Sequence, residues 1–330
     1  MNRVSAVKII GSIGLVISML LNGCTTNSIT DNNVSGNDLT ATEVIRLMGN
    51  GINLGNTLEA YNHKSYVELG VDPTSFETLW GQPVTTRDMI DDMKAMGFDT
   101  LRIPVAWTNG INYESGDYTI DERLMNRVDE VVNYALDADM YVILNEHWDG
   151  SWWGMFGSAD EAVREKGMAL YKSMWTQISE HFSDYSYKLI FESANEELCH
   201  RLNDSDVTGT EGVLSEDECY ETTNRINSEF VKLVRSTGGK NADRFLLIAG
   251  YNTDFRKTCD DRYQMPEDTA KDKLLLSVHY YTPWDYCSDG NAKRWGTPGD
   301  YEEQNSLFQM LTKFTDRGYG VVIGEYAVMG

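Results

Sequence analysis

The sequence predicts a parallel (β/α)8 TIM barrel that lacks its eighth strand and closing helix. Three observations lead to this fold class. Short apolar runs alternate with stretches of helical periodicity, the runs are apolar throughout, and no Gly-rich phosphate turn follows the first of them. Strands that are apolar on both faces are typical of a parallel sheet covered by helices. The segment 51–56 does not match G-x-G-x-x-G, which argues against a doubly wound dinucleotide-binding sheet.

The predicted strands are seven short apolar runs, at residues 51–54, 100–105, 141–145, 188–192, 245–249, 274–278 and 321–323. Helices are predicted between them, where apolar residues recur at helical spacing. One series runs from Met89 to Met96 and stops at Gly97, and another from Leu124 to Leu136 follows Asp121, a residue type that caps helices. Further helices are predicted over 160–182, 221–236 and 301–317.

An eighth strand has no counterpart in the sequence, because the seventh run ends shortly before Gly330. A barrel closes only when its eighth strand pairs with the first. We therefore expect the natural product to be longer by about 40–80 residues, the usual size of these βα units. For a chain that really ends at Gly330 we expect weak activity, because a misplaced carboxylate pair can lose around 10²-fold in rate.

The composition favours a neutral binding partner. The chain carries 28 basic and 51 acidic residues, a formal net charge of −23, with no basic block, so it should repel nucleic acid. Aromatic residues make up 11% of the 330 residues and eight of them are Trp, which suits a protein that handles sugar rings but equally suits a large core. We expect one barrel domain over residues 39–330, monomeric and without a cofactor.

The first 24 residues resemble a bacterial lipoprotein signal peptide. Arg3 and Lys8 precede an apolar stretch from Ile9 to Leu21, which is too short for a permanent membrane span. The segment 21–24 resembles a lipobox, so Cys24 is the expected lipidation site and the protein is expected outside the cell or at its surface, anchored to the membrane. Ordinary secretion and an uncleaved anchor are the alternatives. Residues 25–38 are polar and predict a flexible tether.

Four further cysteines, Cys199, Cys219, Cys259 and Cys287, form an even number in a chain expected in an oxidising compartment. Disulfides are therefore permitted, and four cysteines allow three connectivities. Pairing of nearest neighbours would staple two long loops. Zinc binding is less favoured, because no C-x₂-C spacing occurs.

Polar or ionisable residues follow five of the apolar runs at nearly the same offset. In a parallel barrel the strand ends converge on one face, so these residues are expected to form one site, although any one of them alone could be an ordinary loop or core residue. They are Arg102, Asn145, His147, Trp148, Asn195, Glu196, His279, Tyr281 and Glu325.

This set suits the cleavage of an acetal. Such a reaction needs an acid that protonates the leaving oxygen and a carboxylate that attacks or stabilises the sugar carbon, and Glu196 with Glu325 can supply both. Arg102 is expected to keep a neighbouring carboxylate ionised, and Asn195 to bond a sugar hydroxyl. The two His residues and Tyr281 are expected to orient the carboxylates and the ring.

Several ordered motifs resemble those of glycoside hydrolase family 5, the cellulase family, and look most like its bacterial endoglucanase and xyloglucanase branch. The resemblance runs from about Ala41 to the last residue. The motifs are Asn53 to Leu58 (NLGNTL), Trp80 to Thr86 (WGQPVTT), Leu101 to Val105 (LRIPV), Val142 to Trp148 (VILNEHW), Ile190 to Glu196 (IFESANE), Val278 to Pro283 (VHYYTP) and Ile323 to Tyr326 (IGEY).

The resemblance implies a role for each carboxylate. Glu196 would be the general acid/base and Glu325 the nucleophile of a retaining reaction through a glycosyl-enzyme, with the carboxyl groups roughly 5–5.5 Å apart. Arg102, His147, Asn195, His279 and Tyr281 would be supporting residues. Candidates for substrate binding are Asn53, Trp148, Trp152, Trp153 and Trp284; relatives often carry a second His at the position of Trp148. For Trp152 and Trp153 the alternative is packing within their loop.

Other chemistries have weaker support. Glu146, His147 and His279 could in principle converge on a metal, but no H-E-x-x-H spacing occurs, and no G-x-S-x-G marks a Ser nucleophile. We therefore predict a retaining endo-β-1,4-glucanase acting on cellulose or a related β-glucan. The alternatives are a xyloglucanase, lichenase or mannanase of the same fold, or a non-catalytic glycan-binding lipoprotein of the cell surface.

Overall fold

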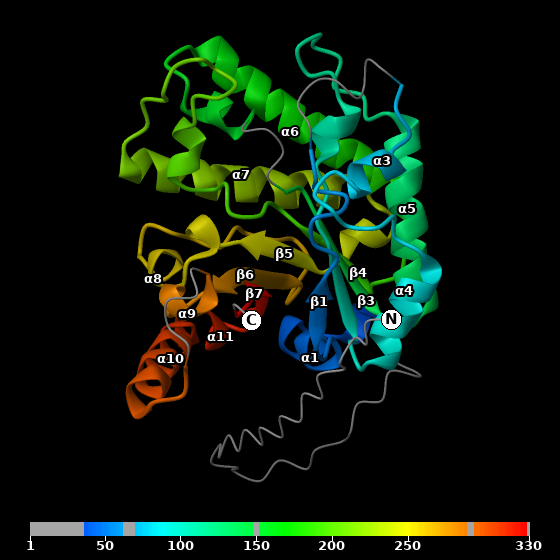
Figure 1. Ribbon diagram of the computed structural model, residues 1–330. Coiled ribbons are helices and arrows are strands. Elements are labelled where there is room, and N and C mark those ends of the chain that lie inside the picture. Colours follow the sequence, from blue (N-terminus) through cyan, green and yellow to red (C-terminus); the bar gives the residue numbers. More distant parts are fainter. Residues whose placement is uncertain (1–35, 62–69, 148–151, 289–293, 329–330) are drawn as a thin grey trace, which may run out of the picture. The chain divides into compact units, whose positions relative to one another are not determined.

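The computed structural model describes residues 36–61, 70–147, 152–288 and 294–328 (Figure 1). The chain divides into two compact units, Met1–Val34 and Ser35–Gly330. The first unit lies outside the described residues, and with it the predicted signal peptide, most of the tether and Cys24, so these stay predictions from the sequence. Within the part of the chain that the structure describes, no helix has the length and apolar character to cross a membrane.

One sheet of seven parallel strands forms the centre of the second unit, and each strand pairs with its neighbours in chain order (Figure 1). This order and the alternation with helices confirm the predicted barrel class. Over the described residues, β1 pairs only with β2 and β7 only with β6. The strands are β1 (Gly51–Asn53), β2 (Thr100–Ile103), β3 (Tyr141–Asn145), β4 (Leu189–Glu192), β5 (Leu246–Ala249), β6 (Leu274–Tyr280) and β7 (Gly320–Tyr326).

The helices begin where the sequence offers a cap. Asp121 accepts the N–H of Arg123 at the start of α5, as predicted, whereas α7 starts five residues earlier than predicted because Ser215 and Glu218 form a capping box. The helices are α1 (Ala41–Leu47), α3 (Thr74–Glu77), α4 (Arg87–Ala95), α5 (Glu122–Asp137), α6 (Glu161–His181), α7 (Glu216–Ser236), α8 (Phe255–Thr258), α9 (Trp284–Cys287), α10 (Pro298–Met310) and α11 (Thr312–Thr315). Short 3-10 turns are Gly36–Asp38, Trp107–Gly110, Trp152–Gly157, His200–Asn203, Gly239–Ala242 and Tyr251–Thr253.

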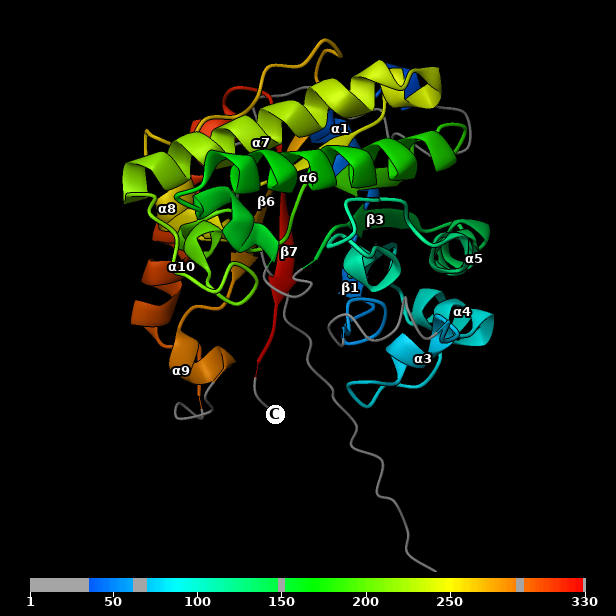
Figure 2. The same cartoon turned by 90° about the horizontal axis from the view of Figure 1, so that it is seen from above.

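The helices cover the outside of the sheet. Figure 2 shows α6 and α7 side by side along one flank, with α4 and α5 beyond β3 and with α8 and α10 on the side of β6. Strands β2 to β5 are buried along their whole length, which agrees with their apolar sequences. The amino-terminal segment is tied to the start of β6, because Lys273 donates to the carbonyls of Gly36 and Leu39.

Strands β6 and β7 extend beyond the apolar runs from which they were predicted. Their register is irregular between Val278 and His279, so that His279 lies opposite Glu325. Both residues therefore lie within paired strands and not in the loops that follow them. A paired strand restricts the backbone, which fixes the direction of both side chains more tightly than a loop would.

All four cysteines of the barrel are free thiols in the structure: Cys199, Cys219 and Cys287 are buried and Cys259 is half-buried. The disulfides that the sequence permitted are therefore not formed. Cys199 instead lies 3.3 Å from the carbonyl of Glu196 and 3.2 Å from Oδ1 of Asn252.

Candidate active site

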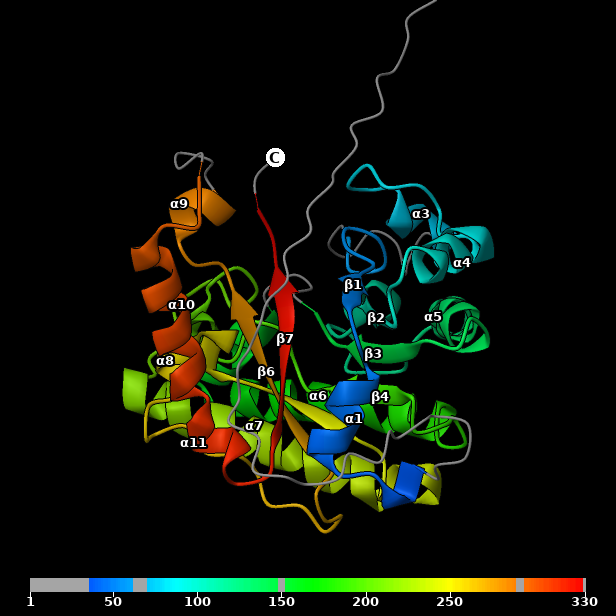
Figure 3. The same cartoon turned by 90° about the horizontal axis from the view of Figure 1, so that it is seen from below.

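The structure brings the predicted polar residues together at the carboxyl ends of the strands. Arg102, Asn145, His279 and Glu325 come from four strands, and Asn195 and Glu196 follow β4. Figure 3 shows this end of the barrel, with α3 beyond β1 and α9 beyond β6 and β7.

Arg102 is the centre of the hydrogen-bond network. Its Nε donates to Glu192 at 2.7 Å, its Nη1 to Glu325 at 2.8 Å, and its Nη2 to Oδ1 of Asn195 at 2.9 Å. Nη1 also reaches Oδ1 of Asn53 at 3.3 Å, while Nδ2 of Asn53 donates to the carbonyl of Gly324. The guanidinium is almost fully buried, and its partners from β1, β7 and the end of β4 hold it in one orientation.

Glu325 is surrounded by donors. Besides Arg102, the hydroxyl of Tyr281 donates to its Oε2 at 3.0 Å, and Nδ1 of His279 lies 3.6 Å from the same oxygen. Burial alone would raise the pKa of Glu325, but electrostatic interactions with His279 and Arg102 outweigh burial and lower the pKa to about 2. Glu325 is therefore an ionised carboxylate across the whole physiological pH range.

Glu196 faces Glu325 across His279. Nδ1 of His279 lies 2.8 Å from Oε1 of Glu196, within hydrogen-bond distance, and 28% of the Glu196 side chain is exposed, compared with 19% for Glu325. One ligand atom each of Glu196, His279 and Glu325 lie within 4.8 Å of one another. Among the described residues, this group could hold a cation. It shares only His279 with the group considered from the sequence, which was Glu146, His147 and His279. That the chain uses no metal stays a prediction.

The tautomer of His147 follows from Asn145. The N–H of Val105 donates to Oδ1 of Asn145, so the amide NH₂ faces Nδ1 of His147 at 3.2 Å. Nδ1 must then accept, which places the proton of the neutral ring on Nε2. Burial, assisted by the charge of Arg102, lowers the pKa of His147 to about 3, so the ring is neutral and donates through Nε2.

Glu192 and Ser277 belong to this network and were missed as site residues by the sequence analysis. Glu192, the last residue of β4, accepts from Arg102 and from Oγ of Ser277 at 2.7 Å, and is completely buried. The sequence could have indicated Glu192, because it ends its apolar run just as Asn145 ends the preceding run. In the structure these two residues lie opposite each other on neighbouring strands.

Two predicted substrate contacts are wrong. Trp152 and Trp153 have exposed fractions of 0% and 1%, and their rings stack at 4.4 Å in the 3-10 turn Trp152–Gly157. Gly154 in this turn presses against the carbonyl of Asp204, so closely that a Cβ there would collide with it. The turn thus packs into the core and offers no aromatic face to a ligand.

The remaining candidates differ in position. Asn53 belongs to the Arg102 network, where it links β1 to β7. Trp284 is 62% exposed and its ring lies 6.4 Å from that of Tyr281, in an edge-on arrangement. Trp148 lies outside the described residues. A second exposed aromatic residue, Trp80 in the segment between α3 and α4, packs edge-on against Tyr61 at 5.6 Å.

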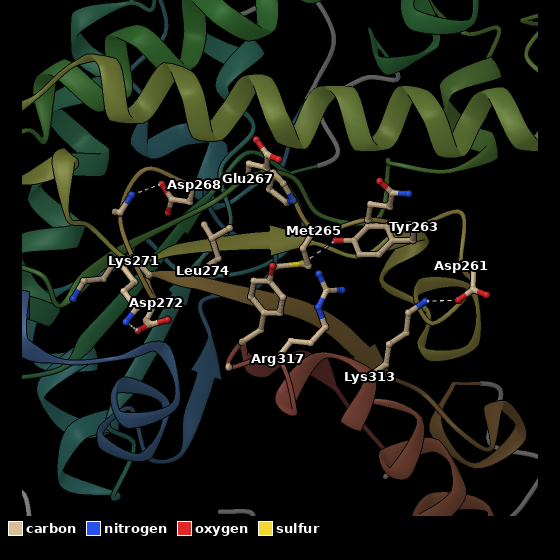
Figure 4. Close-up of a pocket in the computed structure, with 16 residues that line it drawn as sticks. Asp261, Tyr263, Met265, Glu267, Asp268, Lys271, Asp272, Leu274, Lys313 and Arg317 are labelled. Carbon is tan, nitrogen blue, oxygen red and sulfur yellow. Dashed lines mark hydrogen bonds and ion pairs between the residues drawn. The ribbon is translucent and has the colours of Figure 1, made fainter.

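Two of the hollows lined by described residues have neither Glu196 nor Glu325 in their walls. One of about 580 Å³ separates β1 from β7 and is lined by Ile52, Arg102 and Ile323, among others. The other, of about 900 Å³, is drawn in Figure 4 and lies beside Leu274, at the amino end of β6. Two of its carboxylates pair with lysines of its own wall, Asp261 with Lys313 and Asp272 with Lys271. The smaller hollow has no carboxylate among its lining residues.

A parallel (β/α) barrel that gathers two carboxylates at the carboxyl ends of its strands, one ionised and one beside a histidine, belongs to the barrel glycoside hydrolases. The particular family follows from comparison with known proteins. The chain belongs to the cellulase family, glycosyl hydrolase family 5, whose sequence profile matches residues 64–330.

Similar proteins agree with this family. Endoglucanase A of Paenibacillus barcinonensis is 35% identical over 316 residues, covering 87% of this chain and 73% of that protein. A xyloglucan-specific endo-β-1,4-glucanase of Bacteroides ovatus is 33% identical over 311 residues, covering 90% of this chain but 59% of that protein. Among solved structures, a GH5-4 broad-specificity endoglucanase of Ruminococcus champanellensis with bound cellotriose superposes with a TM-score of 0.75 at 33% identity, covering 89% and 81% of the two chains.

Proposed function

We propose that this chain is a retaining endo-β-1,4-glucanase in which Glu325 is the nucleophile and Glu196 the general acid/base. The observation that carries the proposal is the asymmetry of the pair. Glu325 is surrounded by Arg102, Tyr281 and His279, which keep it ionised, whereas Glu196 has one such donor and is more exposed. Oxygens of the two carboxylates lie within 4.8 Å, which suits the short separation of retaining enzymes and leaves no room for the water of an inverting reaction.

In the first step Glu325 attacks the anomeric carbon, and the electron pair of the glycosidic bond moves to the leaving oxygen, which takes the proton of Glu196. In the second step Glu196, now a carboxylate, removes a proton from water, and the water oxygen displaces Glu325 from the sugar. Two inversions restore the configuration of the substrate, and both glutamates return to their starting states.

The neighbouring residues would act on the sugar and on the carboxylates. The Nε2–H of His147 and the amide of Asn195 are donors that can meet hydroxyl groups of the ring bound between the glutamates. Tyr281 would fix one oxygen of Glu325 and so direct the other towards the sugar carbon. The exposed rings of Trp284 and Trp80 lie beyond different strands, which would suit a glucan chain that extends past the cleavage point on both sides, as endo cleavage requires.

The names of the similar proteins do not agree on one preferred glucan. The similar proteins are named endoglucanases, one is specific for xyloglucan, and a Caldicellulosiruptor lichenase in complex with cellotetraose superposes with a TM-score of 0.74 at 31% identity. Linear β-1,4-glucan is the substrate we propose, because cello-oligosaccharides occupy several of the solved relatives. Xyloglucan and mixed-linkage glucan are the alternatives.

The test compares Glu325→Gln and Glu196→Gln with Glu267→Gln, an exposed glutamate near the opposite end of the barrel. We expect Glu325→Gln to lose all measurable release of reducing ends from carboxymethylcellulose, and Glu196→Gln to lose about 10²–10⁴-fold. Glu267→Gln should match the unaltered protein. Proton NMR of the first products should show the β-anomer. An α-anomer formed first, or an active Glu325→Gln, would overturn the proposal.

A further inference from the structure

The turn that carries Glu196 holds a second carboxyl group, Glu197, which the proposed chemistry does not use. Its side chain is 1% exposed. Oε2 accepts the backbone N–H of Asn195 at 3.0 Å, whereas Oε1 is buried and has no hydrogen-bond partner among the described residues. Burial of a carboxyl group with one oxygen unpaired lowers the stability of the fold, so its presence in this turn calls for an explanation.

The contacts of Glu197 hold the backbone on both sides of Glu196. The bond from Asn195 to the Glu197 carboxyl joins the residue before Glu196 to the residue after it and closes a ring around the Glu196 backbone. The carbonyl of Glu197 accepts the N–H of Cys199 at 2.8 Å, and the thiol of Cys199 lies 3.3 Å from the carbonyl of Glu196. The direction of the Glu196 side chain is thus set by a closed set of short contacts.

The hydrogen-bonded ring formed by Asn195, Glu196 and Glu197 is also connected to the rest of the site. Asn195 is held at its N–H by Glu197 and at its side-chain oxygen by Arg102, which in turn binds Glu325. Beyond the turn, the N–H of Asn252, which follows β5, donates to the carbonyl of Leu198 at 3.0 Å. A shift of Glu197 would therefore move Glu196 relative to Glu325.

The charge state of Glu197 agrees with this role. Burial is the largest effect and raises its pKa to about 8; Glu196 adds to the rise, whereas backbone hydrogen bonds and the charge of Arg201 oppose it. The group is thus a neutral carboxylic acid at neutral pH. A neutral acid can accept the N–H of Asn195 without adding a negative charge next to Glu196, which already lies near the ionised Glu325.

We propose that Glu197 is a positioning residue for Glu196: its hydrogen bond to the N–H of Asn195 holds the turn that aims the acid/base at the leaving oxygen of the substrate. The inference rests on the proposed function, because it concerns proton donation by Glu196. It predicts a defect that depends on the leaving group. A sugar leaving group needs the proton of Glu196 when the bond breaks, whereas a dinitrophenolate leaves without it.

The experiment measures kcat/KM, which reports bond cleavage, on cellotetraose and on 2,4-dinitrophenyl β-cellobioside. For Glu197→Ala we expect a fall of about 10²-fold on cellotetraose, as for a catalytic group misplaced by about an ångström, and of less than about 3-fold on the aryl substrate. Glu197→Gln keeps a neutral acceptor of the same shape, so it should stay within about 3-fold of the unaltered protein on both substrates.

Glu77→Gln is the matched control. Glu77 is also a fully buried carboxyl that accepts a backbone N–H, that of Thr85 at 2.7 Å, but its other partner is Arg127, away from the site. Any loss in this variant should be equal on the two substrates. If Glu197→Ala does not fold, Glu197→Met replaces it, because methionine has a similar volume but no hydrogen-bonding carboxyl group. Circular dichroism checks that each variant is folded.

Equal losses of Glu197→Ala on the two substrates, or unaltered activity on both, would overturn the positioning role while leaving the proposed function intact. Full loss of cellotetraose cleavage in Glu197→Gln would also overturn it, because a neutral acceptor would then not suffice. If the unaltered protein cleaves neither substrate, the proposed function fails, and this inference fails with it.

Discussion

Arg102 donates to Glu325 across 2.8 Å, although 223 positions of the sequence separate the two residues. The same guanidinium binds the completely buried Glu192 at 2.7 Å. One cation therefore serves two carboxylates, one structural and one placed for chemistry. Glu192 orients the guanidinium, and the oriented guanidinium keeps Glu325 ionised.

Removal of this cation should make the activity more sensitive to acid. The double variant Arg102→Gln with Glu192→Gln replaces the buried pair by neutral side chains, and the pKa of Glu325 should then rise from about 2 towards its ordinary value of 4.5. Because the nucleophile must be ionised, activity should be lost at a higher pH on acidification. The acid limb of kcat/KM against pH measures the shift. Glu192→Gln alone keeps the cation and is the control; identical acid limbs in the two variants would contradict the prediction.

A side chain at position 324 should disturb the site without touching a carboxylate. A Cβ at Gly324 would lie 3.0 Å from both Nε2 of His279 and Oγ of Ser277, tighter than ordinary contact. We expect Gly324→Ala to lower kcat by about 10²-fold, since His279 binds Glu196 and can yield only by moving. Gly299→Ala meets no such crowding and should keep full activity. Unchanged kinetics of Gly324→Ala would show that this part of the site adapts freely.

His147 should make the fold sensitive to mild acid. Its pKa is lowered from 6.5 to about 3 in the folded state, so the unfolded chain binds more protons between these values and stability falls as the pH drops below about 6.5. The decrease in Tm from pH 7 to pH 5 should therefore be smaller in His147→Gln than in the unaltered protein. The pKa of Glu325 is about 2, below the range from pH 7 to pH 5, so Glu325 stays ionised in the folded protein during this comparison. Equal decreases in Tm would contradict a neutral buried ring.

Trp284 should contribute to substrate affinity and not to the chemical step. The ring is 62% exposed beside Tyr281, and a sugar ring packed on it would bury apolar surface. We expect Trp284→Ala to raise KM for cello-oligosaccharides by about 3–10-fold with kcat nearly unchanged. Met96→Ala, at an exposed apolar residue at the end of α4, controls for loss of surface hydrophobicity. A fall in kcat alone would argue against a subsite at this position.

The sequence by itself determined the order of strands and helices and the main members of the site. Apolar runs marked the strands, and Glu196 and Glu325 stood at or near the ends of two of them, where parallel strands present their residues to one face. Helix starts were predictable where a cap such as Asp121 precedes an apolar series. These features are local, because they depend on residues within a few positions of one another.

Only the tertiary structure decided which of several similar residues does what. Trp152 and Trp284 look alike in sequence, yet the ring of Trp152 is buried and that of Trp284 is exposed, because burial depends on segments far away in the chain. Glu192, Glu196 and Glu197 lie within six positions, but one binds Arg102, one lies beside His279 and one accepts the N–H of Asn195. Their roles depend on charges and donors brought in from other strands, and no local pattern records which distant group each carboxylate will meet.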